Sequence, residues 1–154
     1  MNRVMVSAEV PLPGWSKSLK SYALKVLAQL ERDKWDLSVL LCDDPTIKEL
    51  NSRYRGKNEA TDVLSFALDA GDPFPDSGRR RLAGDIVISL DTLRENARYF
   101  NIGEDEELRR LLIHGILHLD GMDHRTNEKN EPMLQLQERI LENLADVCIL
   151  GRNV

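Results

Sequence analysis

All three histidines of this 154-residue chain lie in one short segment, HGILHLDGMDH, which runs from His114 to His124. Their spacing is H-x-x-x-H-x-x-G-x-x-H. Side chains four positions apart on a helix are neighbours, about 6 Å apart at Cβ, so His114 and His118 can bind the same cation. Gly121 is suited to end this helix, because glycine readily adopts the left-handed conformation found after a helix end. The turn that follows would bring His124 toward the same ion.

Three neutral imidazoles are typical of an open zinc site, in which water takes the fourth position. Bound zinc lowers the pKa of such a water to about 7, so we expect one zinc ion and a hydrolytic reaction. The helix around the histidines is apolar nearly all round, which predicts that it lies in the protein interior. Unpaired imidazoles would be costly to bury there. The apolar residues are Leu111, Leu112, Ile113, Ile116, Leu117 and Leu119.

The same histidine spacing occurs in metzincin proteases, which place a glutamate directly after the first histidine as the general base. In this chain that position is Gly115. A metallopeptidase is therefore an alternative that requires a base from outside the motif. Asp120 and Asp123 are close in sequence, and we expect each of them either to orient an imidazole or to lie at the surface.

The net charge of -5 does not favour nucleic-acid binding by the chain as a whole, but two local clusters are basic. The first contains Arg53, Arg55 and Lys57, where a helix is expected to end before a strand. Arg55 and Lys57 either belong to a solvated helix end or point into a cleft beside the metal. The second cluster is the run Arg79 to Arg81, for which a solvated loop is favoured over contact with an RNA backbone.

The composition is that of an ordinary globular protein, with 42% hydrophobic and 31% charged residues. We expect one domain over residues 1–154. No segment approaches the ~20 apolar residues that span a bilayer, and the N-terminus does not resemble a secretory signal, so we expect a cytoplasmic protein with no membrane contact. Cys42 and Cys148 are expected to be small buried hydrophobic residues.

The hydrophobic patterning predicts the elements that position these residues. Strands are expected at residues 3–10, 36–42, 63–68 and 85–90. Helices are expected from Ser16 or Ser18 to Leu30, from Asp44 to Gly56, from Thr92 to Phe100, from Glu104 to Asp120, and from Met133 to Val147. The fold class is therefore α+β, with a small mixed sheet of about four strands packed with about five helices. The third and fourth strands should form a hairpin with a long, exposed loop.

Three helix starts carry capping signals. Ser16 or Ser18 is the expected cap of the first helix. Asp44 before Pro45 predicts the start of the second, because a carboxylate accepts from free amides and proline needs no donor there. Thr92 and Glu95 are spaced as a capping box for the third.

Four segments together resemble the YbeY family of bacterial endoribonucleases: YRGKNEATDVLSF, GDIVISL, LLIHGILHLDGMDH and EPMLQLQERIL. They occur in the family order, and the resemblance covers nearly the whole chain. The metzincin-like spacing without the glutamate distinguishes this family from the proteases. The resemblance implies that His114, His118 and His124 bind zinc and that Arg55 serves a reaction on RNA. Ala67 departs from the family, since many relatives have proline there.

The resemblance also implies single-strand-specific cleavage in rRNA processing, including 3′-end maturation of the small-subunit RNA, and a role in ribosome quality control. The small ribosomal subunit and its assembly factors would be partners. We expect a zinc-bound water to attack the phosphodiester, Arg55 to stabilise the developing charge, and Lys57 to hold the RNA backbone. Aromatic residues are only 5% of the chain, so little base stacking and weak sequence preference are expected. A non-catalytic zinc-containing ribosome-assembly factor is a further alternative.

Overall fold

The computed structural model describes residues 1–68 and 80–151, and within them four strands and five helices. The order is β1 (Arg3–Ala8), α1 (Ser16–Gln29), β2 (Trp35–Cys42), α2 (Asp44–Arg55), β3 (Val63–Ala67), β4 (Arg81–Ser89), α3 (Leu90–Tyr99), α4 (Glu104–Leu119) and α5 (Pro132–Asn143). The α+β class with a four-stranded sheet and five helices is confirmed. The expected long loop between β3 and β4 falls almost wholly outside the described residues.

The sheet is mixed, with strand order β1-β2-β4-β3. β1, β2 and β4 are parallel, whereas β3 is antiparallel to β4, so that Val63 lies opposite Ile88 and Ala67 opposite Gly84. The predicted hairpin is thus present. It makes β3 an edge strand beside the longest strand of the sheet.

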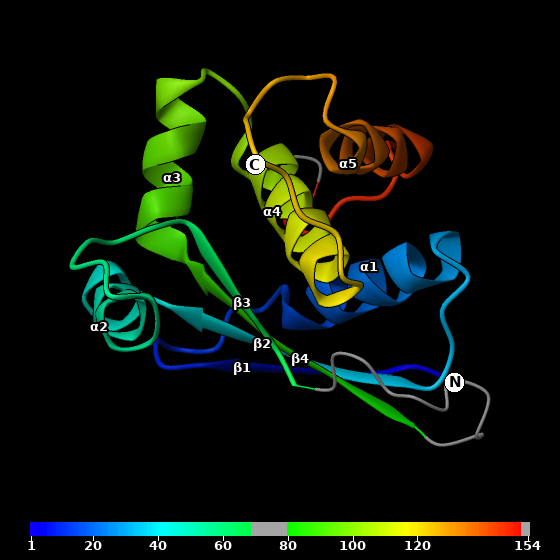
Figure 1. Ribbon diagram of the computed structural model, residues 1–154, viewed down its shortest axis with the longest axis horizontal. Coiled ribbons are helices and arrows are strands. Elements are labelled where there is room, and N and C mark those ends of the chain that lie inside the picture. Colours follow the sequence, from blue (N-terminus) through cyan, green and yellow to red (C-terminus); the bar gives the residue numbers. More distant parts are fainter. Residues whose placement is uncertain (69–79, 152–154) are drawn as a thin grey trace.

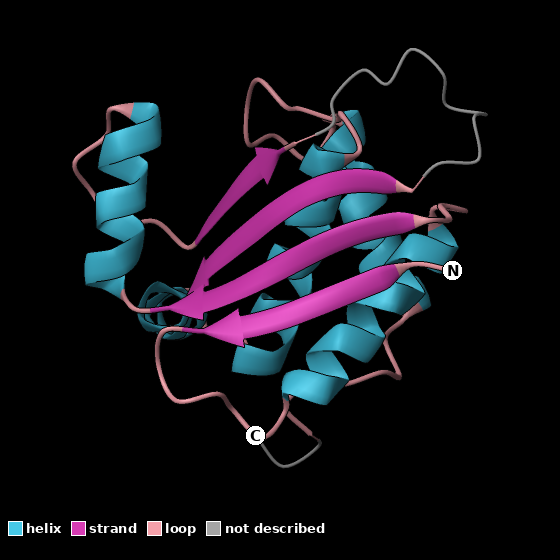
Figure 2. Ribbon diagram, turned by 90° about the horizontal axis from the view of Figure 1, so that it is seen from below, coloured by secondary structure: helices cyan, strands magenta, loops and turns pink. Residues whose placement is uncertain are grey.

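Helices α1 and α4 lie on one face of the sheet, with α5 beside α4 (Figure 1). The main core lies between this face and the helices, where Ile86, Ile113 and Leu117 have no exposed surface. Seen from the opposite side, the strands are not crossed by any described helix, and α2 lies at their end (Figure 2). There Ile47 packs in a smaller cluster with Leu64.

Helix α4 approaches the sheet very closely at Gly115. A Cβ atom at this position would lie 2.9 Å from Cγ2 of Ile86 in β4, which is closer than carbon atoms normally pack. Glycine therefore allows the histidine helix to lie directly on the sheet. It also means that no side chain at position 115 has room between the helix and the sheet.

The predicted helix boundaries agree with the structure better than the predicted caps do. α1 begins at Ser16, but neither Ser16 nor Ser18 caps it; its cap residue is Trp15, with no side-chain bond, and the Ser16 amide donates to the carbonyl of Pro13 (3.1 Å). The expected serine cap is therefore wrong. A preceding turn that supplies this acceptor leaves less need for a capping hydroxyl.

The caps of α2 and α3 also differ from the predicted ones, because the predicted capping side chains bond to distant segments. Asp43 caps α2 by accepting from the Thr46 amide, whereas the Asp44 carboxylate accepts from the hydroxyls of Ser89 (2.6 Å) and Thr92 (2.5 Å). Ser89 instead caps α3, which begins at Leu90. The predicted capping box at Thr92 is wrong, because the hydroxyl of Thr92 bonds across to Asp44.

The cysteines fit an inert role. Cys42 is fully buried, and burial raises the pKa of its thiol to about 12; Cys148 is half-buried rather than buried. Within residues 1–68 and 80–151, the helices are too short or too polar to cross a membrane.

Candidate metal centre

The three histidine rings converge at the end of α4. His114 and His118 lie on the helix, His124 lies in the segment after it, and all three are half-buried. The Nε2 atoms of His114 and His118 are 3.1 Å apart, and the ring centroid of His124 lies 5.2 Å from that of His114 and 5.8 Å from that of His118. One ring nitrogen from each residue lies within 4.8 Å of the others, so this group can hold one metal ion.

The turn that returns His124 to the helix is made at Gly121. This residue has a φ of 91°, and its amide donates to the carbonyl of His118 (3.0 Å). The next amide, of Met122, donates back to Leu117 (3.0 Å), which completes the end of the helix. The Asp123 carboxylate accepts from the backbone amide of His124 and holds this segment in place.

The Nδ1 atom of each imidazole has an oxygen partner. Nδ1 of His114 lies 2.6 Å from Oε1 of Gln137, Nδ1 of His118 lies 3.0 Å from the Met122 carbonyl, and Nδ1 of His124 lies 2.9 Å from the carbonyl of Thr126. Because backbone carbonyls only accept, Nδ1 of His118 and of His124 carries the proton, and the Gln137 oxygen favours the same for His114. The Nε2 lone pairs of His114 and His118 then face each other, an arrangement that a cation between them would stabilise.

Burial favours the neutral form of two of these rings. It lowers the pKa of His114 and of His118, and the neighbouring imidazoles add to the effect, whereas the contacts with Gln137 and Met122 oppose it. Only a neutral imidazole has a lone pair for a metal. The site is therefore competent to bind a cation at neutral pH.

A cleft of about 290 Å³ opens beside His114 and His124. The start of β3 contributes Asp62 and Val63 to its lining, α5 contributes Gln137, and α4 contributes Glu107 and Arg110 as well as His114. Arg110 is already paired with Glu106 (3.2 Å) and Glu138 (2.9 Å).

Asp62, Glu107 and Gln137 are among the polar residues of this cleft that sequence reasoning missed. Gln137 left a signal, since it occupies the buried face of α5 four residues after Met133 and three before Ile140, where an apolar residue is expected. Glu107 left a weaker one as a carboxylate two helical turns before His114. Asp62 left no signal apart from its place in the segment YRGKNEATDVLSF.

Arg55 does not line the cleft. It is the last residue of α2, is exposed, and donates from Nη2 to the carbonyl of Ser65 in β3 (3.2 Å). No described carboxylate pairs with it, whereas Arg53 pairs with Glu49. Lys57 follows the left-handed Gly56 and is exposed, also outside the lining.

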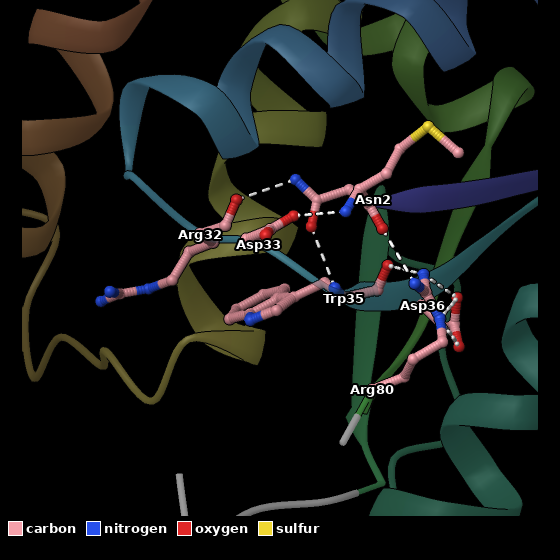
Figure 3. A network of polar contacts seen from close by, with 7 residues as sticks. Asn2, Arg32, Asp33, Trp35, Asp36 and Arg80 are labelled. Carbon is pink, nitrogen blue, oxygen red and sulfur yellow. Dashed lines mark hydrogen bonds and ion pairs between the residues drawn. The ribbon is translucent and has the colours of Figure 1, made fainter. Parts of the chain in front are cut away.

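The arginine run is not a solvated loop where the structure describes it. Arg80 donates to both carboxylate oxygens of Asp36, with a shortest distance of 2.7 Å, and to the carbonyl of Met1 (Figure 3). Arg81 donates to the carbonyl of Leu119 and stacks its guanidinium 4.6 Å from the ring centroid of Trp35.

The solvated loop is therefore wrong for Arg80 and Arg81, whereas contact with RNA, the alternative, stays a prediction. The reason is that β4 begins at Arg81 instead of residue 85, which places both arginines against β2; Arg79 lies outside the described residues. Asp120 does not orient an imidazole either, because its carboxylate pairs with Arg32 (2.9 Å).

Comparisons with known proteins agree with this architecture. A profile of the family described as Endoribonuclease YbeY matches residues 7–145. The Endoribonuclease YbeY of Treponema pallidum (strain Nichols) is 48% identical over 154 residues, covering 98% of this chain and 95% of the relative. That of Treponema denticola is 46% identical over 144 residues, covering 91% and 92%. The solution structure of TM1509 from Thermotoga maritima superposes with a TM-score of 0.65 at 31% identity, covering 93% of this chain and 90% of the other.

The profile spans nearly all of the described elements, and both relatives match along nearly their whole length. This chain therefore belongs to the YbeY family of endoribonucleases.

Proposed function

We propose that this protein is a zinc-dependent endoribonuclease that cleaves single-stranded ribosomal RNA. The observation that carries the proposal is the convergence of three imidazoles whose Nδ1 atoms are already occupied, in a chain that matches an endoribonuclease family over residues 7–145. Three imidazole ligands suit zinc better than they suit magnesium or calcium, which prefer oxygen. When bound, zinc supplies Lewis-acid chemistry that makes a water nucleophilic near neutral pH.

The residues of the chain divide the work. His114, His118 and His124 hold the cation, and Gln137 orients the ring of His114. Arg55 binds a phosphate of the RNA, because a guanidinium can hold two phosphate oxygens at once.

Strand β3 connects this arginine to the cleft. The carbonyl that Arg55 contacts belongs to Ser65, and Val63, two residues earlier on the same face of the strand, lines the cleft. Two residues of a strand span about 7 Å. An RNA backbone that lies along the edge of β3 would therefore reach both the arginine and the histidines, with Lys57 holding a flanking phosphate.

Membership of the family supports the biological part of the proposal. The protein would act in the cytoplasm on ribosomal RNA, in maturing the 3′ end of the small-subunit RNA and in ribosome quality control. Its partners would be the small ribosomal subunit and its assembly factors.

The geometry argues against a peptidase that uses the metzincin glutamate. That residue would stand at position 115, where a Cβ atom would already lie 2.9 Å from Ile86. A glutamate there would push α4 away from β4.

The test compares metal-stripped and zinc-loaded protein on an unstructured RNA, a fully paired RNA and a peptide library. The zinc-loaded protein should cleave the unstructured RNA alone. His114→Ala and Arg55→Glu should each lower the rate by at least ~100-fold, since one removes a ligand of the cation and the other a phosphate contact. RNA cleavage that survives both substitutions would belong to a contaminating nuclease, whereas zinc-dependent peptide cleavage, or RNA binding without turnover, would favour the two alternative functions.

A further inference from the structure

Glu107 faces the metal centre from two turns earlier on the same helix. At 3.6 residues per turn, Glu107, His114 and His118 project within about 40° of one another around α4. Glu107 as a whole residue is 6% exposed, and it lines the same cleft as His114. It is thus a buried acid that shares a cavity with the proposed metal ligands.

This carboxylate has no partner among the described residues. No hydrogen bond or ion pair reaches it, although charged groups surround it: Glu106 and Glu138 pair with Arg110, and Asp62 accepts from Asn96. In the described part of the chain only Tyr22 Oη and Arg81 Nε are sealed from solvent without a partner, so the Glu107 oxygens reach the cleft. Its two oxygens are available to a ligand in the cleft.

The surroundings of Glu107 favour its protonated form. Burial raises its pKa, and the negative charges of Asp62, Glu106 and Glu138 raise it further, opposed by Arg110. The carboxyl therefore holds its proton at pH values where an exposed glutamate has lost it. A general acid needs such a proton at the working pH.

Resting on the proposed ribonuclease function, we propose that Glu107 is the general acid that protonates the leaving ribose oxygen. As the oxygen of a water forms a bond to phosphorus, the bond from phosphorus to the leaving ribose oxygen breaks. That oxygen keeps the electron pair and receives the Glu107 proton. The proton released by the water then restores the carboxyl, so that diester and water give monoester and alcohol.

The histidine motif of this chain supplies no acid–base residue of its own. Position 115, which carries the acid–base residue of the proteases, has no room for a side chain here. Glu107 supplies a carboxyl from another position of the same helix. In contrast to Glu106, which is more exposed and paired with Arg110, it has no competing partner in the described part of the chain.

The test uses the zinc-loaded protein with Glu107→Gln, and Glu106→Gln as the matched control on the same helix. Glu107→Gln should slow RNA cleavage by at least ~100-fold. It should slow cleavage of a p-nitrophenyl nucleotide diester by no more than ~3-fold, because p-nitrophenolate is a good leaving group and needs no proton from a general acid. The fall of the wild-type RNA rate as the pH rises above the Glu107 pKa should disappear. Glu106→Gln, which removes a charge near Glu107 but not the proton donor, should change neither rate by more than ~3-fold.

Two readouts do not depend on activity. Zinc stoichiometry should be the same in wild-type protein and in Glu107→Gln, and NMR of the Glu107 carboxyl carbon in the metal-free protein should show a pKa above that of exposed glutamates. Equal loss on both substrates, reduced zinc content or an ordinary pKa would each overturn the role. Wild-type protein that fails to cleave RNA at all would instead remove the proposed function, and this role with it.

Discussion

Two faces of helix α4 carry buried charged or polar groups, and they differ in whether those groups have partners. On one face, Asp105 accepts from the amides of Ile149 (2.7 Å) and Leu150 (2.8 Å) and pairs with Arg109 (2.8 Å). On the roughly opposite face, Glu107 has no partner in the described part of the chain, and the Nε2 atom of His114 meets only another imidazole there.

The difference separates stability from function. The Asp105 face uses its hydrogen-bonding capacity to fix the segment after α5 onto the helix, as expected of a structural site. The Glu107 face keeps donors and acceptors free beside a cleft, where a ligand can reach them. Substitutions on the Asp105 face should therefore lower the stability and spare the activity. Substitutions on the Glu107 face should lower the activity and spare the stability.

The largest effect is expected from His118→Ala on the cleft face. Loss of one imidazole should reduce bound zinc from one ion per chain to nearly none and lower RNA cleavage by more than ~100-fold, because changing only the partner of a ligating imidazole already costs about 10–100-fold. The unfolding free energy of the metal-free protein should change by less than about 1 kcal/mol. Metal analysis, cleavage assays and denaturant unfolding measure the three quantities. Full activity in this variant would place the reaction elsewhere.

Next in size is Asp105→Ala on the structural face. It leaves the half-buried Arg109 without its carboxylate and two amides without their acceptor, so the protein should lose about 3 kcal/mol of stability. Denaturant unfolding measures this loss. Zinc content and the rate per folded molecule should be retained. A variant that is stable but inactive would show that the two faces are not separate.

A smaller effect is expected from Gln137→Leu, which removes the partner of the His114 Nδ1 atom but keeps the approximate size of the side chain. Zinc affinity should fall by about 10–100-fold, since the ring loses the bond that fixes its tautomer and orientation. Competition with a coloured chelator measures the change. Gln137→Glu, which keeps an acceptor at this position, is the control and should retain most of the affinity.

The smallest effect concerns the pH dependence of stability. The pKa of Glu107 is raised in the folded protein, mainly by burial, so the native state binds the proton more tightly than the unfolded state does. Its contribution is most favourable below the unfolded pKa and is lost as the pH rises through the folded pKa. Glu107→Gln should therefore stabilise the metal-free protein near neutral pH, by less than Asp105→Ala destabilises it, and the gain should vanish in acid. Denaturant unfolding across this pH range measures the gain, and a gain that is independent of pH would contradict the raised pKa.

Local patterns were sufficient where the determining contacts are local. The ends of α2 and α4 were predicted to within a residue or two because a left-handed glycine, Gly56 or Gly121, stops each helix by its own backbone conformation. The pair His114 and His118 needed only helical spacing. The return of His124 also followed from the sequence, because the turn lies only three residues before it.

Sequence reasoning failed where partners come from distant segments. Arg80 was expected to be solvated but pairs with Asp36, 44 residues away, and Asp120 was expected beside an imidazole or at the surface but pairs with Arg32, 88 residues away. Thr92 was expected to cap its own helix and bonds to Asp44 instead. In each case a charged or polar group finds a stronger partner in a distant segment than along the chain.

The sequence by itself therefore determined the α+β fold, the histidine helix and the identity of the three imidazoles, since these depend on periodicity and on backbone conformations within a few residues. Only the tertiary structure decided which of the described cations are free and which are paired, that Gln137 fixes the His114 ring, and that Glu107 stands unpartnered in the cleft. Those properties depend on which distant groups meet when the sheet and helices pack, and the spacing of residues along a chain does not contain them.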